Sequence, residues 1–280
     1  MLQQFGDLNY IFIVNGKLSQ MKNPFIFAVP LKPKASSVDW NNVVRKLNDT
    51  LQSIFRSDEK NFLVVLACQD RPETPYFNDP RFIYLPVNFP PQKDRKFGDR
   101  DKYAKIRLIG SWILQQNVEE SYVMFLDADD LVHKSLVRYV LQDDNKSGYG
   151  IRDGYRFDTV NCELALQTGN FHGSCGSCFV GHFKKDDYPT DENDLNSHFG
   201  QFVRHSIREE LAQQKGKSPV AVPFPAVVYM MNHIESTQMA RKDGEIRTLR
   251  HRDVMAKDDA AKILKDQFGY EIPEREMESV

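Results

Sequence analysis

Long apolar runs are missing from this sequence of 280 residues, and no segment approaches the roughly 20 apolar residues that a membrane-spanning helix needs. The most apolar early run, at 10–14, is too short for the hydrophobic region of a signal peptide and follows no basic stretch. An excess of charge is also missing, because 37 Lys and Arg stand against 39 Asp and Glu. A protein that coats nucleic acid would show a basic excess, so we expect no nucleic-acid partner. We expect a cytoplasmic protein, either free or peripheral at the inner face of a membrane.

Cysteine is scarce, with four residues in the chain, and the sequence shows neither an internal repeat nor a low-complexity tract. In a reducing compartment we expect these cysteines to be thiols rather than disulfides. The composition, 41% hydrophobic and 27% charged, is that of an ordinary folded protein and excludes a disordered or collagen-like chain. The length suits one large domain or two small ones.

The first half of the chain alternates between apolar strands and amphipathic helices. Strands are predicted at 25–30, 62–67, 82–87 and 122–126, and helices at 43–55, 102–116 and 135–142. Strands separated by helices predict a parallel sheet, and strands that are apolar throughout indicate a sheet covered on both faces. The second half is less regular, with a soft boundary near residue 145. It predicts a long amphipathic helix at 193–214, a strand at 226–231 and a short C-terminal helix.

Three carboxylates, Asp127, Asp129 and Asp130, directly follow the apolar stretch at 122–126. Ligands of parallel α/β sheets bind beyond the carboxyl ends of the strands. Three neighbouring acids repel one another, and the sequence places no cation beside them. Mg²⁺ or Mn²⁺ would remove this conflict, because such ions take carboxylate oxygens and commonly hold substrate phosphates as well. The alternative is an acidic turn that caps the next helix, which needs one Asp rather than three.

At this point the sequence resembles the GT-A-fold glycosyltransferases, whose DxD motif at a strand end is matched by Asp127-Ala128-Asp129. The resemblance covers roughly 24–235, as an order of strands rather than as residue identity. It implies an α/β fold of the GT-A type, which is Rossmann-like, with a mostly parallel sheet flanked by helices. It also implies a single domain over 1–280, in which 24–145 binds nucleotide and the less regular part at 146–280 binds the acceptor.

The resemblance implies roles for individual residues of the acid cluster. Asp129 would bind the metal directly, Asp127 would reach the ribose or a metal-bound water, and Asp130 would be a second ligand. A late His often completes the metal site, and His233 after the predicted strand at 226–231 matches it. The alternative for His233 is a polar residue that ends a strand and bonds to backbone.

The same resemblance implies contacts between the nucleotide and residues outside the acid cluster. Pro30 ends the first predicted strand, and Asp70 follows the second. Asp101, Lys102 and Lys105 lie where the helix predicted at 102–116 begins. Two basic segments, at 93–100 and 240–257, are candidates to close over a diphosphate, and Arg250 belongs to the second. The alternative for both segments is a solvated surface loop.

Activation of an acceptor hydroxyl needs a general base in an inverting enzyme but not in a retaining one. The resemblance implies an acidic base ahead of the long helix predicted at 193–214, and Asp191 and Glu192 are the candidates there. Acids at a helix N-terminus are also favoured by the helix dipole whatever their function, so this alternative stays open.

A second group of residues reads H-x2-C-x2-C-x3-H and consists of His172, Cys175, Cys178 and His182. Two Cys and two His can hold a tetrahedral zinc ion. The spacing is more compressed than in a zinc finger, and two buried thiols are the preferred interpretation.

Together these observations predict a glycosyltransferase that depends on Mn²⁺ or Mg²⁺. It would move a sugar from a nucleoside-diphosphate sugar to a hydroxyl of a glycan or lipid-linked glycan acceptor. One alternative is a phosphatase of the haloacid-dehalogenase type with Asp127 as nucleophile, Asp129 as acid and Asp186-Asp187 as late acidic pair, although Leu131 stands where Thr or Val is expected. Another alternative is a non-catalytic sugar-nucleotide-binding domain. The sequence predicts no oligomeric state.

Overall fold

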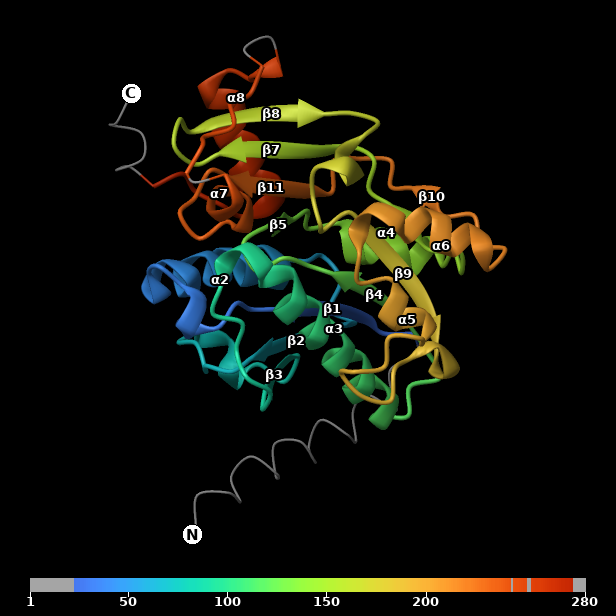
Figure 1. Cartoon of the computed structure of the whole chain (residues 1–280). Coiled ribbons are helices and arrows are strands. Elements are labelled where there is room, and N and C mark those ends of the chain that lie inside the picture. Colours follow the sequence, from blue (N-terminus) through green and yellow to red (C-terminus); the bar gives the residue numbers. More distant parts are fainter. Residues whose placement is uncertain (1–22, 243, 251–252, 274–280) are drawn as a thin grey trace.

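The computed structural model describes residues 23–242, 244–250 and 253–273, so the apolar run at 10–14 lies outside the described residues. Within them, a seven-stranded sheet forms the centre of the molecule, with the order β10-β6-β9-β4-β1-β2-β3 (Figure 1). Its strands are β1 (Phe25–Pro30), β2 (Phe62–Cys68), β3 (Phe82–Pro86), β4 (Glu120–Phe125), β6 (Tyr149–Gly150), β9 (Phe179–Lys184) and β10 (Val220–Ala221). Of these seven strands, β9 alone runs antiparallel to its neighbours. The expected α/β fold, with a mostly parallel sheet flanked by helices, is confirmed.

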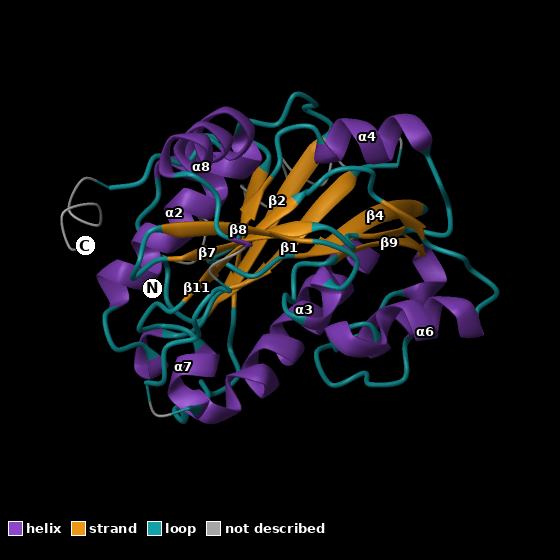
Figure 2. Cartoon of the chain, turned by 90° about the horizontal axis from the view of Figure 1, so that it is seen from above, coloured by secondary structure: helices purple, strands orange, loops and turns teal. Residues whose placement is uncertain are grey.

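Strands β1 and β2 are buried along their whole length. Successive side chains of a strand point to opposite faces, so both faces of the sheet are covered at these strands. The long helices that accompany them are α2 (Trp40–Phe55), α3 (Gly98–Gln115) and α4 (Leu136–Asp143), and Figure 2 shows them around the sheet. Helix α2 begins at Asp39, whose side chain accepts a hydrogen bond from the Asn41 backbone N–H, and buries Leu47, Leu51 and Ile54 along one face.

A second sheet was not predicted. It has four strands in the order β5-β11-β7-β8. They are β5 (Leu131–Val132), β7 (Gly154–Asp158), β8 (Glu163–Gln167) and β11 (Val227–Met231), and β11 is the strand expected at 226–231. The C-terminal helix α8 (Lys257–Ile263) and the π-helical turn after it, Leu264–Phe268, pack on this sheet through an apolar cluster that includes Val228 and Phe268.

The large sheet takes strands from both sides of residue 145, because β6, β9 and β10 join β1 to β4 in it. Residue 145 therefore lies in a turn within one sheet rather than at a structural break. No helix among the described residues is both long and apolar enough to cross a membrane.

The prediction of one long helix at 193–214 is wrong. This stretch forms α5 (His198–Gln201), a 3-10 turn at His205–Ile207 and α6 (Arg208–Gln214). The buried guanidinium of Arg208 donates hydrogen bonds to the carbonyl oxygens of Phe202 and Val203, at 2.8 and 3.5 Å. These bonds satisfy backbone groups that are left without helical partners where α5 ends. An amphipathic pattern cannot reveal this interruption, because it depends on one side chain folding back.

Candidate functional site

A cavity of about 270 Å³ opens beyond the carboxyl ends of β1, β4 and β11. Four segments contribute to its lining: Pro30–Pro33 follow β1, Gly98–Tyr103 begin α3, Asp127–Asp129 follow β4, and His233–Gln238 follow β11. The strand-end position expected for ligands thus coincides with the cavity. Of the predicted nucleotide and metal contacts, the lining includes Pro30, Asp101, Lys102, Asp127, Asp129 and His233.

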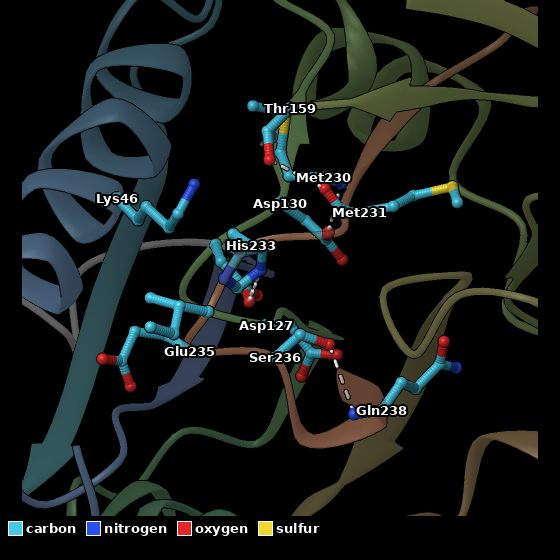
Figure 3. A network of polar contacts seen from close by, with 12 residues as sticks. Lys46, Asp127, Asp130, Thr159, Met230, Met231, His233, Glu235, Ser236 and Gln238 are labelled. Atoms are coloured by element: carbon cyan, nitrogen blue, oxygen red, sulfur yellow. Dashed lines mark hydrogen bonds and ion pairs between the residues drawn. The ribbon is translucent and has the colours of Figure 1, made fainter. Parts of the chain in front are cut away.

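Asp129 and His233 meet in this cavity. β11 ends at Met231, and Asn232 adopts a left-handed backbone conformation with φ of 63°. Its side-chain oxygen accepts a hydrogen bond from the Arg247 backbone N–H at 3.0 Å, and its side-chain nitrogen donates to the Arg247 carbonyl at 2.8 Å. These two bonds fix the turn that leads to His233. The His233 imidazole is 5% exposed, and its Nε2 lies 2.9 Å from Oδ2 of Asp129. Figure 3 shows His233 between Lys46 and Asp130.

The charge of Asp129 is stabilised by its neighbours. Burial raises the pKa of Asp129, but His233, Lys46 and Lys102 outweigh this effect and hold that pKa below its ordinary value. Lys46 comes from α2 and Lys102 from α3. The cations that the sequence does not place beside the acid cluster are therefore brought to it by folding.

The pair formed by Asp129 and His233 fits a divalent metal. Nδ1 of His233 has no hydrogen-bond partner among the described residues, and Nε2 faces only the Asp129 carboxylate, although the ring is buried. Two neighbouring ligands of an octahedral ion, each about 2.1 Å from the metal, lie about 3 Å apart, as these two side chains do. Within the described part of the chain, no three His, Cys, Asp or Glu side chains are grouped as a metal cluster. The protein thus offers two ligands, and phosphate and water would complete the coordination.

The carboxylate of Asp127 is paired with a lysine, and not with His233 as Asp129 is. Its carboxylate forms an ion pair with Lys102, and its backbone N–H donates to the Ser177 hydroxyl at 2.9 Å. Burial lowers the pKa of Lys102, but the neighbouring Asp127 charge more than compensates and raises that pKa. Gly176 lies against the pair, because a Cβ atom at this position would come within 2.6 Å of Asp127 Oδ2 and 3.0 Å of Lys102 Nζ.

Asp130, predicted as a second metal ligand, does not line the cavity. Asp130 is fully buried outside the cavity lining, and its carboxylate accepts hydrogen bonds from the Ser177 hydroxyl, the Cys175 thiol and the Met230 backbone N–H, at 2.6, 3.2 and 3.3 Å. Burial, together with the charges of Asp129 and Asp127, raises the pKa of Asp130 well above its ordinary value. Asp130 joins β4 to β11 and to the loop at 174–178, so its role is structural.

Three predicted nucleotide contacts do not line the cavity. Lys105 is fully buried behind it, where its ammonium donates to Asp101 Oδ2 at 2.5 Å and to the Leu31 carbonyl at 2.6 Å. Asp70 accepts a hydrogen bond from the Lys34 backbone N–H at 2.7 Å, and Arg250 is exposed. Lys105 therefore positions Asp101, whereas Asp70 and Arg250 lie outside the lining.

Asp191 and Glu192, the residues predicted as the base, are also outside the cavity lining. The Asp191 carboxylate is exposed and accepts a hydrogen bond from the Asn193 backbone N–H at 2.7 Å. Glu192 is tied through its backbone carbonyl to the guanidinium of Arg107 at 2.6 Å. Both residues belong to a surface turn before α5. The late acidic pair required by the phosphatase alternative, Asp186-Asp187, lies outside the lining as well.

The four residues of the zinc pattern do not converge. His182 lies on β9 with its Nε2 3.2 Å from a carboxylate oxygen of Glu120, whereas Cys175 donates to Asp130 at 3.2 Å. The Cys178 thiol faces the backbone carbonyl of His172 at 3.9 Å. All four cysteines of the chain are free and buried. The interpretation of Cys175 and Cys178 as buried thiols is confirmed.

The two basic segments meet each other at one side of the cavity. Arg241, in α7 (Thr237–Arg241), donates to the Lys96 carbonyl at 2.9 Å and pairs with Asp99 at 2.6 Å. Arg95 donates to the Ile234 carbonyl. Arg95 and Arg241 both line the cavity, so two cations from separate segments are available to an anionic ligand.

One residue of the site carried no recognisable signal in the sequence. Glu235 is 6% exposed, and its carboxylate binds the Lys32 ammonium at 2.6 Å and the backbone N–H groups of Val38 and Asp39 at 2.9 and 2.7 Å. These contacts join the segment after β11 to the loop after β1. Because the partners lie about 200 positions apart, only the folded chain shows the relationship.

No known family model matches the chain, and no curated protein matches it in sequence. The chain is similar to a crystal structure of 4-diphosphocytidyl-2C-methyl-D-erythritol synthase at 12% sequence identity and a TM-score of 0.35. The similarity covers 80% of this chain and 97% of that chain. A likeness this weak says nothing about the activity of the present chain.

Proposed function

We propose that the chain is a divalent-metal-dependent glycosyltransferase. It takes a nucleoside-diphosphate sugar, with Mn²⁺ or Mg²⁺, and transfers the sugar to a hydroxyl of a glycan or lipid-linked glycan. The observation that supports this proposal most directly is the approach of Asp129 and His233 to 2.9 Å in the cavity beyond the strand ends. A bound ion would supply Lewis-acid stabilisation of the departing diphosphate.

The chain's own residues suit the other needs of such a reaction. Lys102, Arg95 and Arg241 line the cavity and offer charge-assisted hydrogen bonds to phosphate oxygens. The apolar part of the lining, with Leu31 and Val43, is a surface on which a planar base can pack. Fixed cations around a diphosphate favour the leaving group as its negative charge grows.

The phosphatase alternative receives less support from this arrangement. A phosphatase of this type would use the late acidic pair Asp186-Asp187 beside Asp127, but that pair lies outside the cavity that Asp127 lines. The non-catalytic alternative predicts nucleotide binding without turnover, so turnover has to be measured.

The test is a thermal-shift series with UDP, GDP, CDP, dTDP and ADP, each with Mn²⁺ and with EDTA. A ligand at 100 times its dissociation constant adds about 2.7 kcal/mol to the free energy of unfolding, and we expect one diphosphate to do so only with the metal. Sugar nucleotides that carry the same base are then assayed for release of the diphosphate.

Para-nitrophenyl phosphate is the control substrate for the phosphatase alternative. We expect no turnover of this substrate by the wild type. Turnover that disappears in Asp127→Asn would favour the phosphatase, and the absence of any metal-dependent stabilisation by all five diphosphates would contradict the proposal.

A further inference from the structure

The cavity lacks an obvious proton acceptor among its carboxylates. Each of the five that line it is paired with a basic side chain: Asp99 with Arg241, Asp101 with Lys105, Asp127 with Lys102, Asp129 with His233 and Glu235 with Lys32. In each pair the basic side chain already occupies a carboxylate oxygen, so none of the five carboxylates is an unpartnered acceptor for an incoming hydroxyl. The phenols of Tyr103 and Tyr229 have raised pKa values because they are buried, so they are not bases at neutral pH either.

His205 differs from all of these groups. It lies in the 3-10 turn His205–Ile207, lines the cavity and is partly exposed to it. Among the described residues its side chain makes no hydrogen bond or ion pair, so its ring nitrogens are available. Unlike His233, it has no carboxylate of the described residues in contact with its ring.

The position of His205 is fixed by its neighbour Arg208. The Arg208 guanidinium donates to the Gly176 carbonyl at 2.7 Å, and Gly176 packs against the pair of Asp127 and Lys102. This contact ties the turn that carries His205 to the loop that packs against Asp127 and Lys102.

The surroundings of His205 favour the neutral form of its ring. Burial lowers the pKa of His205 below its ordinary value. Arg208 and Lys102 act in the same direction, and they outweigh the opposing charges of Asp127 and Asp99. These four groups are the charges that face the ring from the helices and the strand end around it. A neutral imidazole beside a cleft is the usual form of a general base.

We propose that His205 is the catalytic base of this cavity, a role that rests on the proposed glycosyl transfer. As the acceptor oxygen forms its bond to the anomeric carbon, the bond from that carbon to the diphosphate oxygen breaks. The diphosphate leaves with the electron pair of that bond, and the proton of the acceptor hydroxyl passes to a ring nitrogen of His205. Attack from the side opposite the diphosphate inverts the anomeric centre.

Water is the probe acceptor, because it can replace the unidentified acceptor hydroxyl in a slow hydrolysis of the donor. We expect His205→Ala and His205→Gln to lower the rate of diphosphate release at pH 7.5 by at least about 100-fold, as for other general bases. Affinity for the nucleoside diphosphate with Mn²⁺ should stay within about twofold of wild type. Added imidazole should restore part of the rate to His205→Ala, which leaves space for it.

His172→Gln is the matched control, because His172 lies close by in the turn Phe171–Gly173 but outside the cavity lining. We expect His172→Gln to release diphosphate at the wild-type rate, and we expect added imidazole to leave that rate unchanged. The wild-type rate should fall as the pH drops below the ordinary value of about 6.5 for His, and this acidic limb should be absent from His205→Ala.

Several outcomes would overturn the role of His205. They are a wild-type rate in His205→Ala, a rate in His205→Gln within about threefold of wild type, or retention of the anomeric configuration in the product. A wild type that binds no nucleoside diphosphate with Mn²⁺ would instead remove the proposed function, and the base with it. The two failures are distinguished because only the second abolishes binding in the unmodified chain.

Discussion

The carboxylate of Asp129 and the imidazole of His233 lie 2.9 Å apart although they follow strands of two different sheets, β4 and β11. The two sheets therefore have to keep their relative position for this pair to exist. Asp130, the residue after Asp129, makes part of that connection by accepting a hydrogen bond from Met230 on β11 at 3.3 Å. One acid of the cluster faces the cavity while its neighbour holds together the elements that form it.

Asp129→Asn should weaken metal-dependent binding of a nucleoside diphosphate by about tenfold or more, which corresponds to about 1.4 kcal/mol. The amide removes the negative charge that a hard cation requires, whereas affinity measured in EDTA should barely change. Isothermal titration with the diphosphate that binds wild type, in Mn²⁺ and in EDTA, makes this comparison. Equal loss in both buffers would mean that Asp129 contacts the nucleotide rather than a metal.

His233→Ala should lower the affinity for Mn²⁺ itself, because one of the two protein ligands is lost and only water can replace it. His198→Ala is a control for the loss of a buried His, since His198 packs against Phe183 and Phe202 away from the cavity. The control should lose stability but keep its Mn²⁺ affinity, measured by competition with a metal indicator. Identical Mn²⁺ affinities in wild type and His233→Ala would remove His233 from the site.

The sequence predicted the first half of the fold well because its signals are local. Buried strands such as β1 and β2 are continuous apolar runs, and α2 has its apolar residues at helical spacing, so each element is visible in its own stretch of chain. The acid cluster was recognised for the same reason, because it directly follows an apolar strand. His233 was singled out by the resemblance, and its approach to Asp129 depends on how two different sheets are arranged.

The errors arose where a role depends on contacts between distant parts of the chain. Asp130 and Asp129 are equivalent in a motif, but only folding shows that Ser177 and Met230 surround Asp130. Asp191 was singled out because the resemblance implies an acidic base before the long predicted helix, and that helix is interrupted where Arg208 binds the carbonyls at the end of α5. His205 became visible only when the same interruption placed it in the cavity lining.

Asp130→Asn should change the dependence of stability on pH. The pKa of Asp130 is raised in the folded state, so its ionisation costs stability as the pH rises above the unfolded value of about 3.9. Below that pH both states hold the proton and the cost is absent. We therefore expect the wild type to lose stability relative to Asp130→Asn between about pH 4 and pH 7, as urea unfolding at several pH values would show.

Asp130→Ala is the companion variant. It removes the acceptor of three hydrogen bonds, and leaving a buried donor unsatisfied costs about 1–3 kcal/mol at every pH. A constant difference between wild type and Asp130→Asn across this range would show that the carboxylate is ionised in the folded protein without cost.

Glu235→Ala should destabilise the chain by about 2 kcal/mol, because it leaves Lys32 and two backbone N–H groups without their acceptor. Metal-independent nucleotide affinity should fall as well, since the loop after β1 is held against the segment after β11 by this side chain. Glu245→Ala is the control, because Glu245 pairs with the exposed Lys242 and such surface pairs contribute little. An equal effect of the two substitutions on unfolding would contradict the structural role of Glu235.

Gly176→Ala tests how closely the loop at 174–178 approaches the ion pair of Asp127 and Lys102. The added Cβ atom would lie 2.6 Å from Asp127 Oδ2, so the pair has to move or the loop has to retreat. We expect nucleotide affinity with Mn²⁺ to fall at least about fivefold while the free energy of unfolding drops by about 1–3 kcal/mol, as for other overpacked sites. Gly98→Ala is the matched control, because its Cβ atom would meet Thr237 at an ordinary 3.4 Å at the start of α3. If both variants bind nucleotide as wild type does, the contact between Gly176 and the ion pair does not shape the binding site.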